Sequence, residues 1–197
     1  IGRFFFVVNN PTLHIKSSSK YSYHNEVGEL NDLVNGEKAE SFEYARYWHG
    51  WLSFLRPLLL IFNLSQIRTI LTILLIALAS ILLFLLSKHI NIFTAALFLF
   101  SLISVEYFYL GFSLEDIFVF LISVVSSIVL LLRFKKIKKI GMFFFVTGMI
   151  TNFLDFLTVP IVTLATPLII YLLLKQKENN IIFKEQFLMI IKCSVFW

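Results

Sequence analysis

Long apolar runs limit the fold of this chain more than any other feature of its sequence. The stretch IRTILTILLIALASILLFLL (67–86) holds twenty residues with a single charge, Arg68. Two further apolar runs follow it, NIFTAALFLFSLISVEYFYLGF (91–112) and IFVFLISVVSSIVLLL (117–132). A membrane-spanning helix needs about 20 mostly apolar residues. We therefore predict membrane-spanning helices over 67–86, 91–112 and 117–132.

The next apolar segment, 141–174, is too long for one crossing. A single helix over it would measure about 51 Å, against a hydrocarbon core of roughly 30 Å. We therefore predict a hairpin of two helices over 141–155 and 158–174. The apolar pattern resumes over 181–197, which predicts the start of a further span or an amphipathic helix.

The composition supports a membrane protein. Hydrophobic residues make up 58% of the chain and charged residues 15%, whereas about a quarter of the residues of a soluble domain are charged. The expected fold class is all-α integral membrane, a polytopic helical bundle with an outer loop region and an interfacial amphipathic helix. The 23 Phe, with abundant Ile, Lys and Asn, favour an AT-rich bacterial genome. We therefore expect the chain in a bacterial cytoplasmic membrane.

Basic residues predict the orientation of the helices. Cytoplasmic loops are enriched in Lys and Arg, so RFKKIKK (133–139) and KQK (175–177) mark two inside connections. The chain must cross an even number of times between them, which puts the tip of the hairpin outside. Counting back places 88–89 inside and 9–66 outside. Ten of the twelve acidic residues then lie at or near the outer face, so the net charge of +5 does not indicate nucleic-acid binding.

We expect the chain to be a piece of a larger polytopic protein, because apolar patterns run to both of its ends. The expected organisation has four parts: the end of a preceding span (1–8), an extracytoplasmic loop (9–41), an interfacial amphipathic helix (42–56) and a transmembrane domain (57–197). The loop is too poor in apolar residues to form a core of its own. A single cysteine, Cys193, excludes a disulfide framework within the chain.

The segment SFEYARYWHGWLSFLRPLLL (41–60) combines aromatic and charged residues. At 100° per residue its polar and aromatic side chains fall on opposite arcs, which predicts an amphipathic helix along the outer membrane surface, interrupted at Pro57. Arg binds phosphate through its planar guanidinium. We therefore predict a lipid phosphate or pyrophosphate site at Arg46 and Arg56, with His49 and Trp48 beside them. The alternative is an anchor helix without a ligand.

Asp155 lies in the middle of the apolar hairpin segment. A carboxylate near the membrane is costly, so it marks a functional site by default; the alternative is a cap or turn residue at the tip. The neighbouring prolines and threonines are typical of a broken or re-entrant element. Glu106 is a second candidate for a buried carboxylate, with an interhelical polar contact as the alternative. Four scattered histidines predict no metal site.

The segments YARYWHGWLSFLRPLLLIFNLSQIR and NFLDFLTVPIVTLATPLI resemble patterns in uncharacterised polytopic membrane proteins of Gram-positive bacteria. The layout of the chain is distantly similar to GT-C glycosyltransferases, with a large first outer loop, an amphipathic helix on the outer surface and acidic residues at outer span ends. This resemblance implies transfer of a sugar from a polyprenyl-phosphate carrier outside the membrane. It also implies a catalytic carboxylate in the outer region.

The leading hypothesis is therefore a cell-envelope glycosyltransferase. Arg46 and Arg56 would hold the carrier phosphate, and one outer acid would act as general base. The candidate acids are Glu26, Glu29, Glu43 and Asp155. The cofactor is unknown, although a divalent cation is compatible with such a site. The expected partners are membrane lipids, a polyprenyl-phosphate sugar donor and the remainder of the same chain. The alternatives are a transporter or flippase for a lipid-linked or small substrate and a non-catalytic membrane assembly subunit.

Overall fold

A computed structural model describes residues 50–112, 114, 117–154, 159–179 and 182–197, with the backbone alone at 15–18, 41–44, 108, 112 and 179. The chain divides into two compact units, Ile1–Ile67 and Arg68–Trp197. The predicted end of a preceding span, 1–8, lies outside the described residues.

The described residues of the first unit form a small antiparallel sheet, helix α3 and the start of the next helix. Strand β1 (Ile15–Ser18) pairs with strand β2 (Ser41–Tyr44) in a register that places Lys16 opposite Glu43. Helix α3 (Leu52–Ile61) follows a turn at residues 50–51. It buries leucines at helical spacing, at positions 52, 55 and 59.

The helix predicted over 42–56 is wrong in its first part, because Ser41–Tyr44 is a β-strand and the helix begins only at Leu52. The sequence SFEY alternates polar and aromatic residues, a period of two that fits a strand as well as an amphipathic helix. Aromatic residues favour strands, and pairing with β1 satisfies the backbone of this segment. Glu43 therefore lies on β2 and not on the polar arc of a helix.

The prediction that Pro57 interrupts this helix is also wrong, since α3 continues through it to Ile61. The boundary lies instead at Phe62, whose backbone is extended. Asn63 then begins the next helix: its side chain accepts from the backbone N–H of Gln66, and the Gln66 side chain accepts from the backbone N–H of Asn63, both at 2.9 Å. This reciprocal capping box satisfies two N–H groups that the first turn leaves free.

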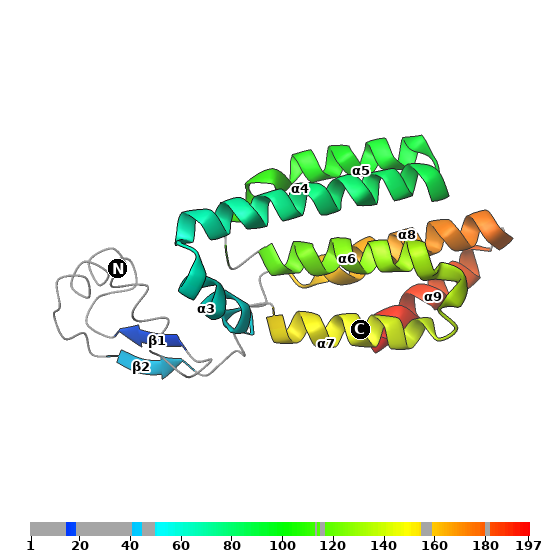
Figure 1. Cartoon of the computed structure of the whole chain (residues 1–197). Coiled ribbons are helices and arrows are strands. Elements are labelled where there is room, and N and C mark those ends of the chain that lie inside the picture. The colour runs from blue at the N-terminus through cyan, green and yellow to red at the C-terminus, as the bar shows by residue number, and fades with distance from the viewer. Residues whose placement is uncertain are drawn as a thin grey trace. The chain divides into compact units, whose positions relative to one another are not determined.

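The second unit is a helical bundle. Each α-helix runs in the opposite direction to the next one along the chain (Figure 1). The helices are α4 (Leu64–His89, which begins in the first unit), α5 (Ile92–Ser104), α6 (Ile117–Arg133), α7 (Ile140–Leu154), α8 (Ile161–Asn179) and α9 (Phe183–Phe196). Two 3₁₀ helices, η1 (Tyr107–Phe112) and η2 (Phe134–Lys136), lie in the connections. Helix α6 packs mainly on α8, and α7 packs mainly on α9.

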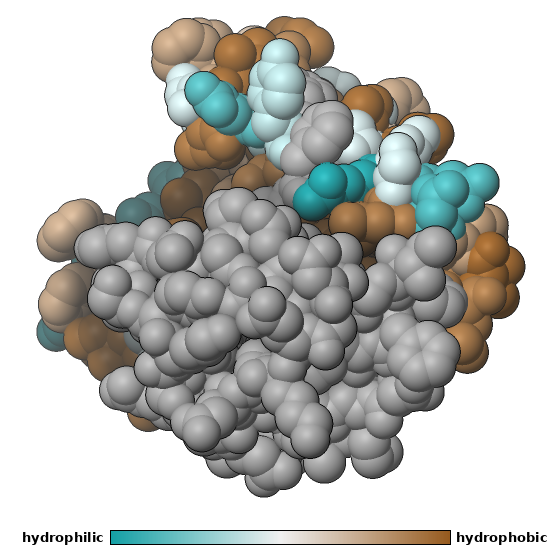
Figure 2. Space-filling view, turned by 90° about the vertical axis from the view of Figure 1, so that its left-hand side faces the viewer, coloured by the Kyte–Doolittle hydropathy of each residue, from teal (hydrophilic) through white to brown (hydrophobic). Residues whose placement is uncertain are grey.

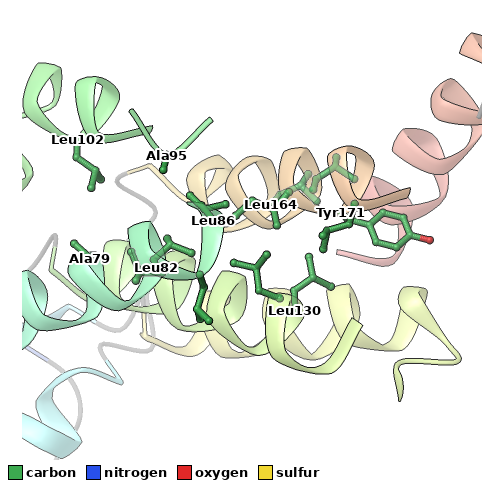
Figure 3. Close-up of a cluster of buried hydrophobic side chains, with 14 of the residues drawn as sticks. Ala79, Leu82, Leu86, Ala95, Leu102, Leu130, Leu164 and Tyr171 are labelled. Atoms are coloured by element: carbon green, nitrogen blue, oxygen red, sulfur yellow. The ribbon is translucent and has the colours of Figure 1, made fainter. Parts of the chain in front are cut away.

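One buried apolar cluster joins these helices (Figure 3). Leu82 and Leu86 of α4 and Leu130 of α6 are buried in it, and Leu164 and Tyr171 come from α8. These side chains recur at helical spacing on their helices, so each helix turns one apolar face inward.

Two of the described helical segments are long and apolar enough to cross a membrane, Leu64–His89 and Ile117–Lys136. The first is about 39 Å long at 1.5 Å per residue. Much of the outward surface is also apolar: Phe84, Phe93 and Phe100 are between 64% and 69% exposed. Hydrophobic residues, in brown, occupy much of the coloured surface in Figure 2. Soluble monomers rarely expose so many large apolar side chains together.

Most of the segments predicted to be helical are helices in the structure. Helix α4 covers 67–86, α6 covers 117–132, and α7 and α8 form the two arms predicted over 141–155 and 158–174. Helix α9 occupies most of 181–197. Between α7 and α8, residues 155–158 lie outside the described residues.

The predicted single helix over 91–112 is wrong beyond Ser104. Glu106 has a φ of 52°, in the left-handed region that ends an α-helix. The following residue, Tyr107, is fully buried, and its hydroxyl donates to the Leu75 carbonyl oxygen of α4 at 3.2 Å. Helix α5 therefore ends after 13 residues, just before the chain buries Tyr107 against α4. An apolar pattern does not reveal this change, because the residues on both sides of it are equally hydrophobic.

Replacement of Gly111 by alanine should destabilise the bundle. A Cβ atom at Gly111 would collide with Oγ1 of Thr72 and lie 3.0 Å from the Thr72 Cα atom. Overpacking of this kind costs about 1–3 kcal/mol. Thermal unfolding in detergent should show a lower midpoint for G111A, whereas S101A, at an exposed position of α5, should unfold like the native protein. Equal midpoints for G111A and the native protein would contradict the close contact between η1 and α4.

Candidate functional site

Most of the residues predicted to form the site lie outside the described part of the chain. These are Glu26, Glu29, Arg46, Trp48, His49 and Asp155. Of the predicted set, the structure describes the backbone of Glu43 on β2 and the side chain of Arg56 on α3. Of the residues predicted to bind phosphate, the structure thus describes Arg56, and of the four candidate acids it describes the backbone of Glu43.

Arg56 is half-buried on α3, next to the buried Leu55. Desolvation by this burial lowers the pKa of its guanidinium from the ordinary value. Arginine nevertheless stays charged in proteins, so Arg56 keeps its positive charge at physiological pH. A partly desolvated cation attracts an anion more strongly than a fully hydrated one. Arg56 is the one positive charge that the structure describes among the residues predicted to bind phosphate.

Glu106 is exposed in the structure and is not a buried carboxylate. Its role in the fold is that of a turn residue: its backbone N–H donates to the Ile103 carbonyl, and its own carbonyl accepts from the Tyr109 N–H. These bonds join the end of α5 to η1. Because its backbone is left-handed, Glu106 occupies a position that favours glycine or asparagine.

The polar side chains that the structure does bring together are hydroxyl groups buried between α6, α7 and α8. They are Ser123, Ser126, Ser127, Thr147, Thr151 and Thr163. Several of them bond within their own helix: Ser126 and Ser127 donate to the Ser123 carbonyl, and Thr147 donates to the Phe143 carbonyl. The Ser123 hydroxyl donates instead to the Val162 carbonyl of α8, at 3.3 Å. The spacing SVVSS on α6 is the sequence signal for this face, because positions three and four residues apart lie together.

Thr163 is the centre of this hydroxyl cluster. Its Oγ1 accepts from Trp197 Nε1, next to α9, at 3.2 Å, and from Thr151 Oγ1 of α7 at 2.9 Å, where the single Thr151 hydrogen is shared with the Thr147 carbonyl at 2.8 Å. The same hydroxyl donates to the Pro160 carbonyl at 2.8 Å. A hydroxyl has one donor hydrogen and two acceptor lone pairs, so Thr163 uses its full capacity. The cluster therefore binds helices together and leaves no spare hydrogen-bonding group on Thr163 for a ligand.

Glycine allows the closest approach at this interface. A Cβ atom at Gly148 of α7 would collide with the Trp197 carbonyl oxygen. Small residues and interhelical hydrogen bonds are what joins helices in lipid, where neighbouring apolar surfaces gain little from association. The threonines and prolines of this region were predicted to mark a broken element, but within the described residues α8 is continuous through Pro167.

Basic connections gather at one end of the bundle. The Lys177 ammonium donates to the carbonyl oxygens of His89 and Ile90 at 2.8 and 3.1 Å, which ties α8 to the turn between α4 and α5. Lys175 lies 5.4 Å from the ring centroid of Phe134, in the connection between α6 and α7. The α4–α5 turn, the α6–α7 connection and the C-terminal end of α8 therefore meet at the same end of the second unit.

No protein-family model, curated protein sequence or solved structure matches this chain. Within the part of the chain that the structure describes, no three His, Cys, Asp or Glu side chains are grouped to hold a metal ion.

The hydrogen bond between Thr151 and Thr163 should contribute measurably to the stability of the bundle. In a double-mutant cycle of T151V, T163V and both together, we expect a coupling energy of about 0.5–2 kcal/mol, as for other hydroxyl contacts between membrane helices. Equilibrium unfolding in mixed detergent measures it. S104A, whose hydroxyl bonds only within α5, serves as the control. Strictly additive effects of the two valine substitutions would contradict a direct bond.

Proposed function

We propose that this chain is a polytopic integral membrane protein. Two observations support the proposal: the length of α4, which exceeds the roughly 30 Å of hydrocarbon, and the large apolar side chains on the outside of the bundle. The satisfied hydroxyls between the helices support it further, because unsatisfied polar groups are very costly in lipid. In this proposal the exposed apolar residues contact acyl chains.

We further propose that the basic end of the bundle faces the cytoplasm. This follows from the enrichment of Lys and Arg in cytoplasmic loops. The opposite helix ends are Ser104, Ile117, Leu154 and Ile161. The connections between them carry Glu106, Glu115, Asp116 and Asp155 in the sequence, and Glu106 is the one that the structure describes. The acidic connections thus adjoin the helix ends opposite the basic ones.

This separation of charge is the observation that carries the proposed activity. We propose a cell-envelope glycosyltransferase that uses a polyprenyl-phosphate sugar at the outer membrane face. Arg46 and Arg56 hold the carrier phosphate. One outer carboxylate, from the set Glu26, Glu29, Glu43 and Asp155, removes the proton of the acceptor hydroxyl.

The reaction follows from these roles. The deprotonated acceptor oxygen attacks the anomeric carbon of the sugar, and the bond from that carbon to the phosphate oxygen breaks. The electron pair leaves with the carrier phosphate, whose added negative charge the arginines stabilise. The proton stays on the carboxylate until solvent removes it.

Removal of Arg56 should weaken binding of the carrier. A hydrogen bond to a charged group contributes about 1.5–3 kcal/mol, so R56A should bind polyprenyl phosphate roughly 10- to 150-fold more weakly. Titration of the purified protein in nanodiscs measures this. At least one of E26Q, E29Q, E43Q and D155N should abolish transfer of radiolabelled sugar while leaving carrier binding intact. K88A, an exposed change at the basic end, is the matched control for loss of one positive charge. Native binding by R56A, with no sugar transfer by the native protein, would overturn the proposed activity.

A transporter or flippase is the second candidate function, and α5 is the observation that favours it. This helix is about 20 Å long and continues as η1, so irregular backbone lies beside α4 at the level of Leu75 and Thr72. Discontinuous helices form the substrate sites of many transporters. In this alternative the exposed Glu106 carboxylate lies on the path of a polar headgroup.

The two functions are separable in proteoliposomes. If the chain is a flippase, the native protein should move a fluorescent lipid-linked sugar between leaflets, and E106Q should slow that movement severalfold. S104A, two residues away at the end of α5, is the control. A native protein that leaves the probe in its original leaflet would contradict the flippase alternative. Absence of both transfer and translocation would favour a non-catalytic assembly subunit.

A further inference from the structure

The connection between α6 and α7 has an unusual pattern of anchors and charges. We call residues 133–140, RFKKIKKI, the basic loop. Its apolar residues Phe134, Ile137 and Ile140 recur every third position and pack against the core. Its basic residues are all exposed; they are Arg133, Lys135, Lys136, Lys138 and Lys139. The loop thus exposes five cations, while its apolar side chains anchor it to the core.

Contacts with α8 fix the shape of the basic loop. The ring centroids of Phe134 and Tyr171 lie 6.0 Å apart. The Lys175 ammonium also lies over the Phe134 ring, 5.4 Å from its centroid. The backbone N–H of Ile137 donates to the Arg133 carbonyl at 3.1 Å. These contacts hold the backbone of the loop, so its lysines are gathered before any ligand arrives, which lowers the entropy cost of binding.

The acids at this end of the bundle are already engaged. Glu178 pairs with Lys175 at 3.4 Å. The Glu185 carboxylate accepts from the backbone N–H of Ile182 at 3.4 Å and caps α9. Among the residues that the structure describes, no acidic side chain pairs with the five cations of the basic loop. Five like charges within seven positions repel one another, and an external anion relieves that repulsion.

The surroundings of the loop identify the anion. Arg133 ends α6 beside Leu132, which is 58% exposed, and α7 begins at Ile140, close to Met142, which is 51% exposed. The cations therefore border an apolar surface, as expected at the level of lipid headgroups. We propose that the basic loop binds the phosphate groups of anionic phospholipids in the leaflet at this end. This inference rests on the proposed insertion in a membrane and is independent of the transferase activity.

The test compares lipid selectivity in phosphatidylcholine bilayers. Spin-labelled phosphatidylglycerol or phosphatidylcholine is added in trace amounts, and electron paramagnetic resonance gives the association of each with the protein. The native protein should prefer phosphatidylglycerol, and 1 M salt should abolish the preference. A lysine near an anionic surface contributes about fivefold in affinity. K138Q/K139Q should therefore lower the preference at least fivefold, and K138R/K139R should keep it.

The control removes the same two charges from α9. K184Q/K192Q changes exposed lysines outside the basic loop and should leave the preference within twofold of native. A preference that survives K138Q/K139Q, or one that K184Q/K192Q lowers equally, would overturn the inference. Extraction with alkaline carbonate separates this outcome from failure of the membrane proposal: protein released from the bilayer contradicts insertion, whereas inserted protein without a preference contradicts the basic loop alone.

Discussion

Polar groups buried between apolar helices must find their partners inside the bundle, and the Thr163 hydroxyl shows how this chain meets that constraint. It joins α7 through Thr151, the end of α9 through Trp197 and the start of its own helix through Pro160. Gly148 supplies the space that lets Trp197 approach α7. Such bonds and close contacts help to determine which helices pair, and their share would be largest in lipid, where apolar surfaces gain little from association. The arrangement of α7, α8 and α9 depends on them.

The same constraint explains the ends of the helices. At the basic end, Lys177 donates to the carbonyl groups of His89, the last residue of α4, and of Ile90, which follows it. Such carbonyls have no partner within a helix, and a cation near a helix C-terminus is also favoured by the helix dipole. Near the other end, the buried Tyr107 takes up the Leu75 carbonyl and α5 stops short. A few hydrogen bonds therefore satisfy the end of α4 at the basic end of the bundle and accompany the early end of α5.

Hydropathy was sufficient to predict α4, α6 and the hairpin of α7 and α8, because helix and apolar run coincide in each. It was insufficient at Glu106, where a backbone conformation ends α5 without any change in apolar content. It was misleading at Ser41–Tyr44, where a period of two and a period of 3.6 fit the same four residues and pairing with a distant strand decides between them. Long-range pairing of this kind is not readable from a local pattern.

The arrangement of the site residues, unlike the helices, is not predictable from local sequence patterns. The predicted members of the site come from residues 26–56 and from Asp155 in the predicted hairpin, and residue types alone do not specify contacts between segments so far apart in the sequence. The hydroxyl face of α6 was overlooked, although the spacing of Ser123, Ser126 and Ser127 indicates it. Serines in an apolar run are readily taken as neutral filler, and their role becomes evident when Ser123 meets the Val162 carbonyl of α8.

The central claim is that the two ends of the bundle lie on opposite sides of a membrane. Single cysteines at Val159, between α7 and α8, and at Lys136, in the basic loop, test it in a C193S background, since both positions are exposed. The account predicts that a membrane-impermeant maleimide labels V159C in intact cells and labels K136C only after permeabilisation. Labelling of both positions from the same side would contradict it.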